Sequence, residues 1–178
     1  HRILALRDEF PERIHYVLGN HDFAHIGGPH TAKFFDDEAA HLEEQLAPAQ
    51  REELRRLFSS AHLCVLAPCG ALFSHGAPGL AFQSLSDVFG VRLPHDPADS
   101  YARSLIDNFT LYYGQTELIT RALLERVSRE SGLALRFVVH GHDRDEEGWF
   151  ASDGLLLCPC IFGAARMHKR FLVLALDT

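Results

Sequence analysis

The chain has 178 residues, of which 47% are hydrophobic and 23% are charged, and its formal net charge is −7. This composition is typical of one globular domain, and we expect residues 1–178 to form a single domain. The acidic balance argues against a basic surface for nucleic acid. No apolar run reaches the roughly 18 residues of a membrane span. We therefore expect a cytoplasmic protein with neither a nucleic acid nor a membrane as partner.

Apolar periodicity and turn-forming residues predict a mixture of helices and strands. We expect helices at residues 2–9, within 36–59 with an interruption at Pro48, and within 98–131 with a break near Gly114. We expect strands at 14–18, 62–67, 71–74, 135–139, 149–151, 155–158 and 171–176. Helices dominate the middle of the chain and strands return at its end. This order predicts an α/β fold, as an open sheet or a layered α/β/α sandwich.

Three of the predicted strands run directly into a short loop that contains glycine and side chains able to bind a metal. These loops are Gly19-Asn20-His21-Asp22, His75-Gly76 and His140-Gly141-His142-Asp143. Because strand ends of an open α/β sheet converge on one edge, side chains from distant loops can meet there around a ligand. Imidazole nitrogens and an amide oxygen are competent ligands for Zn, Fe or Mn. The three loops together predict a metal site, although any one of these histidines alone is more often structural.

The four cysteines, Cys64, Cys69, Cys158 and Cys160, match neither CxxC pairs nor a small disulfide framework. Each lies in or beside an apolar run, which favours buried free thiols. The alternative is a structural zinc site built from cysteine and histidine. That alternative predicts loss of metal on mutation of Cys158 or Cys160 and no loss on mutation of Asn20.

The three loops resemble motifs of the calcineurin-like metallophosphoesterases, and within them the serine/threonine phosphatase-like branch. Gly19-Asn20-His21-Asp22 resembles the GNH(D/E) motif, Ser74-His75-Gly76 the (S/C)HG or HA motif, and Gly141-His142 the final GH motif. The order of the motifs also agrees, and the resemblance covers nearly the entire chain. It implies a calcineurin-like α/β/β/α sandwich of two mixed sheets flanked by helices.

The resemblance also implies roles for individual residues. Asn20, His75 and His142 would bind one of two divalent metal ions, which are Mn, Fe, Zn or Ni. His21 would be the general acid that protonates the leaving oxygen, with Asp22 beside it helping to orient the loop. His140 could bind the metal or support His142. The implied reaction is hydrolysis of a phosphoester by a metal-bridging hydroxide, on a phosphoprotein or a small phosphorylated molecule.

The first two motifs of the family, GDxHG and GDxxDRG, do not occur in the 178 residues. In the family they supply the remaining metal ligands and the aspartate that supports the catalytic histidine. The chain begins without Met, at a point that resembles the helix after GDxxDRG. We therefore expect the C-terminal two-thirds of the domain, without its first strands. Such a fragment alone should bind metal weakly and hydrolyse little, because three neutral ligands cannot offset two divalent cations.

Two departures from the family pattern leave the substrate open. Residues 107–114 lack the arginine that clamps phosphate in eukaryotic protein phosphatases, and residues 158–163 replace the SAPNY-like segment. A bacterial-type serine/threonine phosphatase-like enzyme fits these features. A dinucleoside polyphosphate hydrolase and a non-catalytic scaffold with the same fold are the alternatives.

Overall fold

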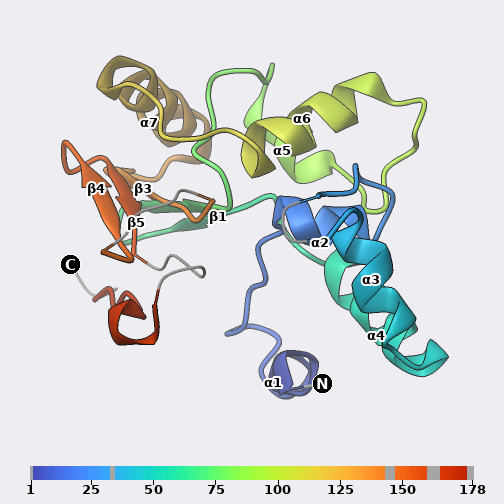
Figure 1. Cartoon of the computed structure of the whole chain (residues 1–178). Helices are drawn as coiled ribbons and strands as arrows, with labels where there is room; N and C mark the ends of the chain where they lie inside the picture. The colour runs from blue at the N-terminus through green and yellow to red at the C-terminus, as the bar shows by residue number, and fades with distance from the viewer. Residues whose placement is uncertain (1, 33–34, 143–146, 160–164, 176–178) are drawn as a thin grey trace.

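A computed structural model gives the structure of residues 2–32, 35–142, 147–159 and 165–175 (Figure 1). The helices are α1 (Arg2–Glu9), α2 (Asn20–Ala24), α3 (Glu38–Glu44), α4 (Pro48–Ser59), α5 (Leu85–Gly90), α6 (Ser100–Thr110), α7 (Glu117–Ser131) and the 3-10 helix η1 (Arg166–His168). The strands are β1 (Cys64–Ala67), β2 (Ala71–Ser74), β3 (Phe137–Val139), β4 (Phe150–Ser152) and β5 (Leu156–Cys158). None of the helices in these ranges is long and apolar enough to cross a membrane.

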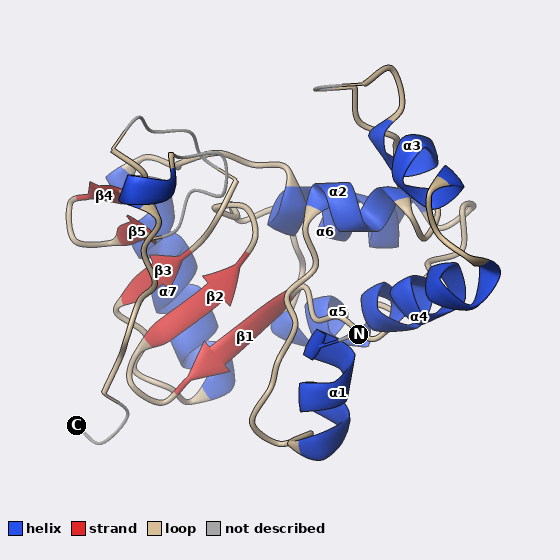
Figure 2. Ribbon diagram, turned by 60° about the horizontal axis from the view of Figure 1, so that its bottom comes forward, coloured by secondary structure: helices blue, strands red, loops and turns tan. Residues whose placement is uncertain are grey.

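The strands form one five-stranded mixed sheet in the order β1-β2-β3-β5-β4 (Figure 2). The central strands β2, β3 and β5 are parallel, whereas β1 and β4 run antiparallel at the two sides. In the β2–β3 register Phe73 lies opposite Val139, so both strands end at the same edge of the sheet. The predicted α/β class, a mixed sheet flanked by helices, is confirmed. The described residues form one sheet, whereas the resemblance implies two.

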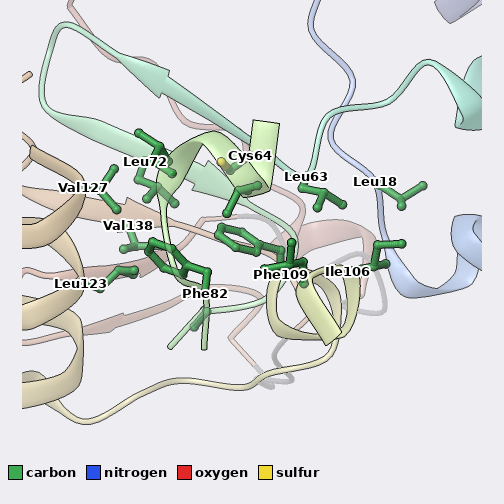
Figure 3. Close-up of a cluster of buried hydrophobic side chains, with 14 of the residues drawn as sticks. Leu18, Leu63, Cys64, Leu72, Phe82, Ile106, Phe109, Leu123, Val127 and Val138 are labelled. Carbon is green, nitrogen blue, oxygen red and sulfur yellow. The ribbon is translucent and has the colours of Figure 1, made fainter. Parts of the chain in front are cut away.

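The main core lies between the sheet and the helices α5, α6 and α7. Leu72 and Val138 of the sheet, Phe109 of α6 and Leu123 and Val127 of α7 are at most 1% exposed. Figure 3 shows these side chains gathered around the rings of Phe82 and Phe109, whose centroids are 6.2 Å apart. Burial of each such side chain contributes roughly 1.5–3 kcal/mol. The core therefore fixes β2 and β3 against α6 and α7.

The opposite face of the sheet carries a smaller cluster. Cys69, Ala71 and Val139 are buried there, and Phe73 and Phe137 are among the half-buried residues that pack on them. Leu174, from the C-terminal segment, lies on this cluster. The chain after η1 therefore covers part of the second face.

Two of the predicted strands, at residues 14–18 and 171–176, were wrong, because neither segment forms a strand in the described residues. Within residues 14–18 only Val17 pairs, through an isolated parallel bridge to His62. Strand β1 begins at Cys64, beyond His62, so it does not pair with the rest of this segment. Residues 171–175 form no strand, and Phe171 and Val173 are 84% and 77% exposed. Leu176, the end of that prediction, lies outside the described residues.

The structure also contains helix α5, which was not predicted, and several predicted elements begin or end at other residues than expected. Helix α5 begins with a capping box in which Ser84 Oγ accepts from Asp87 N at 3.2 Å and Asp87 Oδ2 accepts from Ser84 N at 3.0 Å. The loop at Asn20 is itself the first turn of α2. The other predicted helices and strands are confirmed with shifts of their ends, which is usual for boundaries.

Candidate functional site

The sheet brings the metal-capable loops to one edge. His75 follows β2 directly, and His140 follows β3. Gly141 N donates to the His75 carbonyl at 2.9 Å, which joins the two loops through the backbone. The bridge from Val17 to His62 brings the third loop alongside, with Leu18 N donating to His62 O at 2.9 Å. Residues that are distant in sequence therefore meet at this edge.

Three of the predicted ligand side chains are in contact. His75 Nε2 lies 2.9 Å from Asn20 Oδ1, and His142 Nδ1 lies 3.2 Å from His75 Nε2. Two ligands bound at right angles to an ion, with bonds of about 2.0–2.2 Å, are separated by about 3 Å. The distances from His75 to Asn20 and from His75 to His142 therefore match those between two ligands of one divalent ion, and all three side chains have suitable donor atoms.

The protonation state of His75 suits this arrangement. Burial, followed by the neighbouring His142, His21 and His140, lowers its pKa to about 4. The imidazole is therefore neutral at pH 7, which is the form that binds metals. Within the described ranges, no carboxylate or thiol joins these side chains in a group of three or more His, Cys, Asp or Glu residues that could hold a metal.

Asp22 holds the loop that carries Asn20. Its Oδ2 accepts from Gly19 N at 2.9 Å and from the Tyr16 hydroxyl at 3.1 Å. Burial raises the pKa of the Asp22 carboxyl, against the two hydrogen bonds that lower it, and burial also raises the pKa of Tyr16. A Cβ at Gly19 would lie 3.1 Å from Asp22 Oδ2 and 3.2 Å from the His75 ring. The absence of a side chain at residue 19 therefore allows Asp22 and His75 to approach from both sides.

The His75 loop is fixed to the end of α6. Gly76 N donates to Phe109 O at 2.7 Å, and Ala77 N donates to Tyr112 O at 2.8 Å. A Cβ at Gly76 would lie 2.8 Å from the Tyr112 carbonyl oxygen. Only glycine allows this close approach of two backbone segments.

The two histidines after β3 have different surroundings. His142 has a φ of 65°, in the left-handed region, and its ring centroid lies 4.5 Å from that of Tyr113. His140 is 3% exposed, and its Nδ1 lies 2.9 Å from Gly141 O. His140 therefore contacts the backbone of its own loop, whereas His142 contacts His75. Asp143 lies outside the described residues.

His21 stands beside this group with its side chain 48% exposed. Its Nδ1 lies 2.8 Å from Glu38 Oε2 and 3.0 Å from Thr31 Oγ1. Neither Thr31 nor Glu38 was predicted from the sequence as a site residue. Their spacing in the sequence gives no signal of a site, because an acidic residue in the first turn of a helix is common as a means of stabilising the helix.

The cysteines show no metal cluster in the described part of the chain. Cys64, Cys69 and Cys158 are buried, Cys64 and Cys69 as free thiols, and burial raises the pKa of the Cys64 thiol to about 12. Cys158 Sγ lies 3.5 Å from Gly141 O, behind the loop with His142. Cys160, the other cysteine of the structural-zinc alternative, lies outside the described residues.

Comparison with known proteins gives a similarity of fold. No family model and no curated protein sequence matches the chain. Among solved structures, the chain is similar to a protein serine/threonine phosphatase from Saccharomyces cerevisiae, described as similar to human phosphatase PP5. The TM-score is 0.56 at 18% sequence identity, over 87% of this chain and 50% of that chain. The chain thus spans about half the length of that structure and shares its fold over that part.

Proposed function

We propose that the chain is the C-terminal part of a metal-dependent phosphoric ester hydrolase of the calcineurin-like type, in the serine/threonine phosphatase-like branch. The observation that carries this proposal is the meeting of Asn20, His75 and His142 at one sheet edge, within 2.9 and 3.2 Å contacts. The motifs around these residues, and the fold shared with a structure described as a serine/threonine phosphatase, support it.

Asn20 Oδ1, His75 Nε2 and His142 Nδ1 are the atoms that would hold one divalent ion, and His140 supports the loop of His142. Two divalent ions, Mn, Fe, Zn or Ni, in the complete domain would activate water and bind phosphate oxygens. His21 is half exposed beside this group and would donate a proton to the leaving oxygen. Asp22 would keep the loop in place through Gly19 N.

The substrate would be a phosphoprotein or a small phosphorylated molecule, and the enzyme would be cytoplasmic and of bacterial type. A non-catalytic scaffold is the second candidate. It is favoured by one observation, namely that in the described residues no carboxylate joins the three neutral side chains proposed as ligands. Three neutral ligands bind a divalent cation weakly when no anionic ligand joins them.

Metal binding and turnover test the proposal separately. Mn²⁺ binding is measured by titration calorimetry on the wild-type chain and on Asn20→Ala, His75→Ala and His21→Ala, with the exposed His15→Ala as control. Hydrolysis of para-nitrophenyl phosphate is measured on this chain and on the longest reading frame that contains it.

We expect Asn20→Ala and His75→Ala to weaken Mn²⁺ binding by at least about tenfold. His21→Ala should keep metal binding and lower turnover by roughly 10²–10⁴-fold. Equal Mn²⁺ affinity in all four variants would reject the metal site. Metal binding without turnover, in the protein from the longest reading frame as well, would favour the non-catalytic scaffold over the hydrolase.

A further inference from the structure

Tyr113 lies beside the proposed metal ligands but outside the recognised motifs. Its ring centroid is 4.5 Å from that of His142, and the planes of the two rings are inclined by 45°. His142 Nδ1 in turn lies 3.2 Å from His75 Nε2. An aromatic ring in contact with one of the proposed ligands therefore borders the place where a bound ion would hold its substrate.

Backbone contacts tie the Tyr113 segment to this edge of the sheet. Tyr113 belongs to the connection between α6 and α7 (Figure 1). Ala77 N, two residues after His75, donates to Tyr112 O at 2.8 Å. Gln115 Nε2 donates to Tyr113 O at 3.0 Å. The position of Tyr113 is thus linked to the loop that carries His75.

Much of Tyr113 is open to solvent. The residue is 56% exposed, so its contact with His142 uses only part of the ring. A simpler account is that Tyr113 packs against His142 and only supports it. The two accounts predict different effects of a substitution. A supporting role predicts weaker metal binding, whereas a surface for a ligand predicts weaker binding of that ligand at unchanged metal affinity.

The chemistry of the segment favours an aromatic group on the substrate. Residues 107–114 contain two adjacent tyrosines and no lysine or arginine. Such a segment cannot pair with acidic residues that flank a phosphate, but the face of a tyrosine ring stacks against another aromatic ring. Metal ions would hold the phosphate itself. The group that meets Tyr113 is therefore the one to which the phosphate is attached.

We propose that Tyr113 is a specificity-determining residue whose ring stacks on an aromatic leaving group. The substrate class is then an aryl phosphoester, which includes phosphotyrosine in a peptide and small aryl phosphates. Tyr113 binds and orients this group and takes no part in bond cleavage. The inference rests on the proposed function, because the phosphate must first be held at the metal edge.

The first test measures binding without hydrolysis. Phenylphosphonate and methylphosphonate are titrated by calorimetry, with Zn²⁺ present, into the protein from the longest reading frame that contains the chain. Tyr113→Leu removes the flat ring and keeps an apolar side chain, whereas Tyr113→Phe keeps the ring. Tyr112→Leu is the matched control, since Tyr112 is the neighbouring residue and is 44% exposed.

We expect Tyr113→Leu to weaken phenylphosphonate binding by about 3- to 10-fold and methylphosphonate binding by less than about twofold. Tyr113→Phe and Tyr112→Leu should bind both phosphonates as the wild type does. The Zn²⁺ affinity should be the same in all variants.

Turnover gives a second readout, with a phosphotyrosine peptide and the phosphoserine peptide of the same sequence. Tyr113→Leu should lower kcat/KM for the first peptide through a higher KM and leave that for the second unchanged. The larger kcat/KM, for the phosphotyrosine peptide or for phenyl phosphate, then assigns the substrate to a phosphoprotein or to a small molecule.

Three results would overturn the proposal. Phenylphosphonate binding that is unchanged in Tyr113→Leu would exclude stacking on the ring. Equal losses for both phosphonates, together with a lower Zn²⁺ affinity, would leave Tyr113 as a support for His142. Failure of the proposed function would look different, because the wild type would then show no metal-dependent binding of either phosphonate, and both proposals would fall together.

Discussion

Replacement of Gly76 by alanine tests how the His75 loop is held. The added Cβ would lie 2.8 Å from Tyr112 O, 3.1 Å from Tyr112 N and 3.2 Å from Phe109 O. Ordinary contacts between carbon and a carbonyl oxygen lie at about 3.3–3.6 Å. All three neighbours are backbone atoms, so no side chain can rotate away. The loop and the end of α6 must separate by about half an ångström.

The cost follows from the packing strain and the hydrogen bonds at this contact. An added methyl group in a packed region typically costs about 1–3 kcal/mol. The bonds from Gly76 N to Phe109 O and from Ala77 N to Tyr112 O would lengthen, and each is worth roughly 0.5–1.5 kcal/mol. We expect Gly76→Ala to lower the free energy of unfolding by about 2–4 kcal/mol. For a chain of this size, that lowers Tm by about 4–16 °C.

The assay is chemical and thermal denaturation followed by circular dichroism, with Gly90→Ala as the matched control. A Cβ at Gly90 meets nothing within 4 Å, so this change should be neutral or stabilising by about 0.4–1 kcal/mol. Mn²⁺ affinity should also fall in Gly76→Ala, because His75 is the preceding residue. A Gly76→Ala protein as stable as Gly90→Ala would refute the argument from close backbone approach.

Three further predictions concern the core, the pH dependence and the thiols. Leu123→Ala should lower the free energy of unfolding by about 2–5 kcal/mol. Leu118 lies on the same helix and is 79% exposed, so Leu118→Ala should change that free energy by less than about 0.5 kcal/mol. Similar urea midpoints for the two variants would contradict the orientation of α7. Burial, then His15 and Arg7, lowers the pKa of His62 below 6.5, so the unfolded state binds its proton more readily and stability is lost as the pH falls below about 6.5. His62→Gln should therefore make Tm less sensitive to acid, and an identical pH profile would exclude this contribution. Iodoacetamide should label Cys64 only on unfolding, and mass spectrometry showing rapid native labelling would contradict its burial.

The longer helices α6 and α7 were predictable because their signals are local. Asp99 and Thr116 cap α6 and α7 with side-chain oxygens, and Gly132 ends α7 with a φ of 75°. These residues stand next to apolar residues at helical spacing, so sequence neighbours suffice to recognise the element. The strand order was not predictable in this way. Strand β5 lies between β3 and β4, and such pairing is decided by contacts between distant segments.

Residues 14–18 show why a strand cannot be identified from composition alone. The apolar run is present, but a strand requires a partner along its length, and only Val17 has one in the described residues. At the site, the motifs identified Asn20, His75 and His142, which the fold brings into contact. Glu38 was missed because its relation to His21 depends on the path of the intervening loop, which no motif records.

The bond from Gly141 N to His75 O ties loops from two parallel strands to each other. An amide exchanges with solvent only when its hydrogen bond opens. Opening the bond from Gly141 N to His75 O would require movement of the C-terminal ends of strands β2 and β3, which are anchored in the main core. The Gly141 amide should therefore exchange nearly as slowly as the central sheet. A ligand that enters at this edge would meet loops already ordered by folding, and little of its binding energy would be consumed in arranging them.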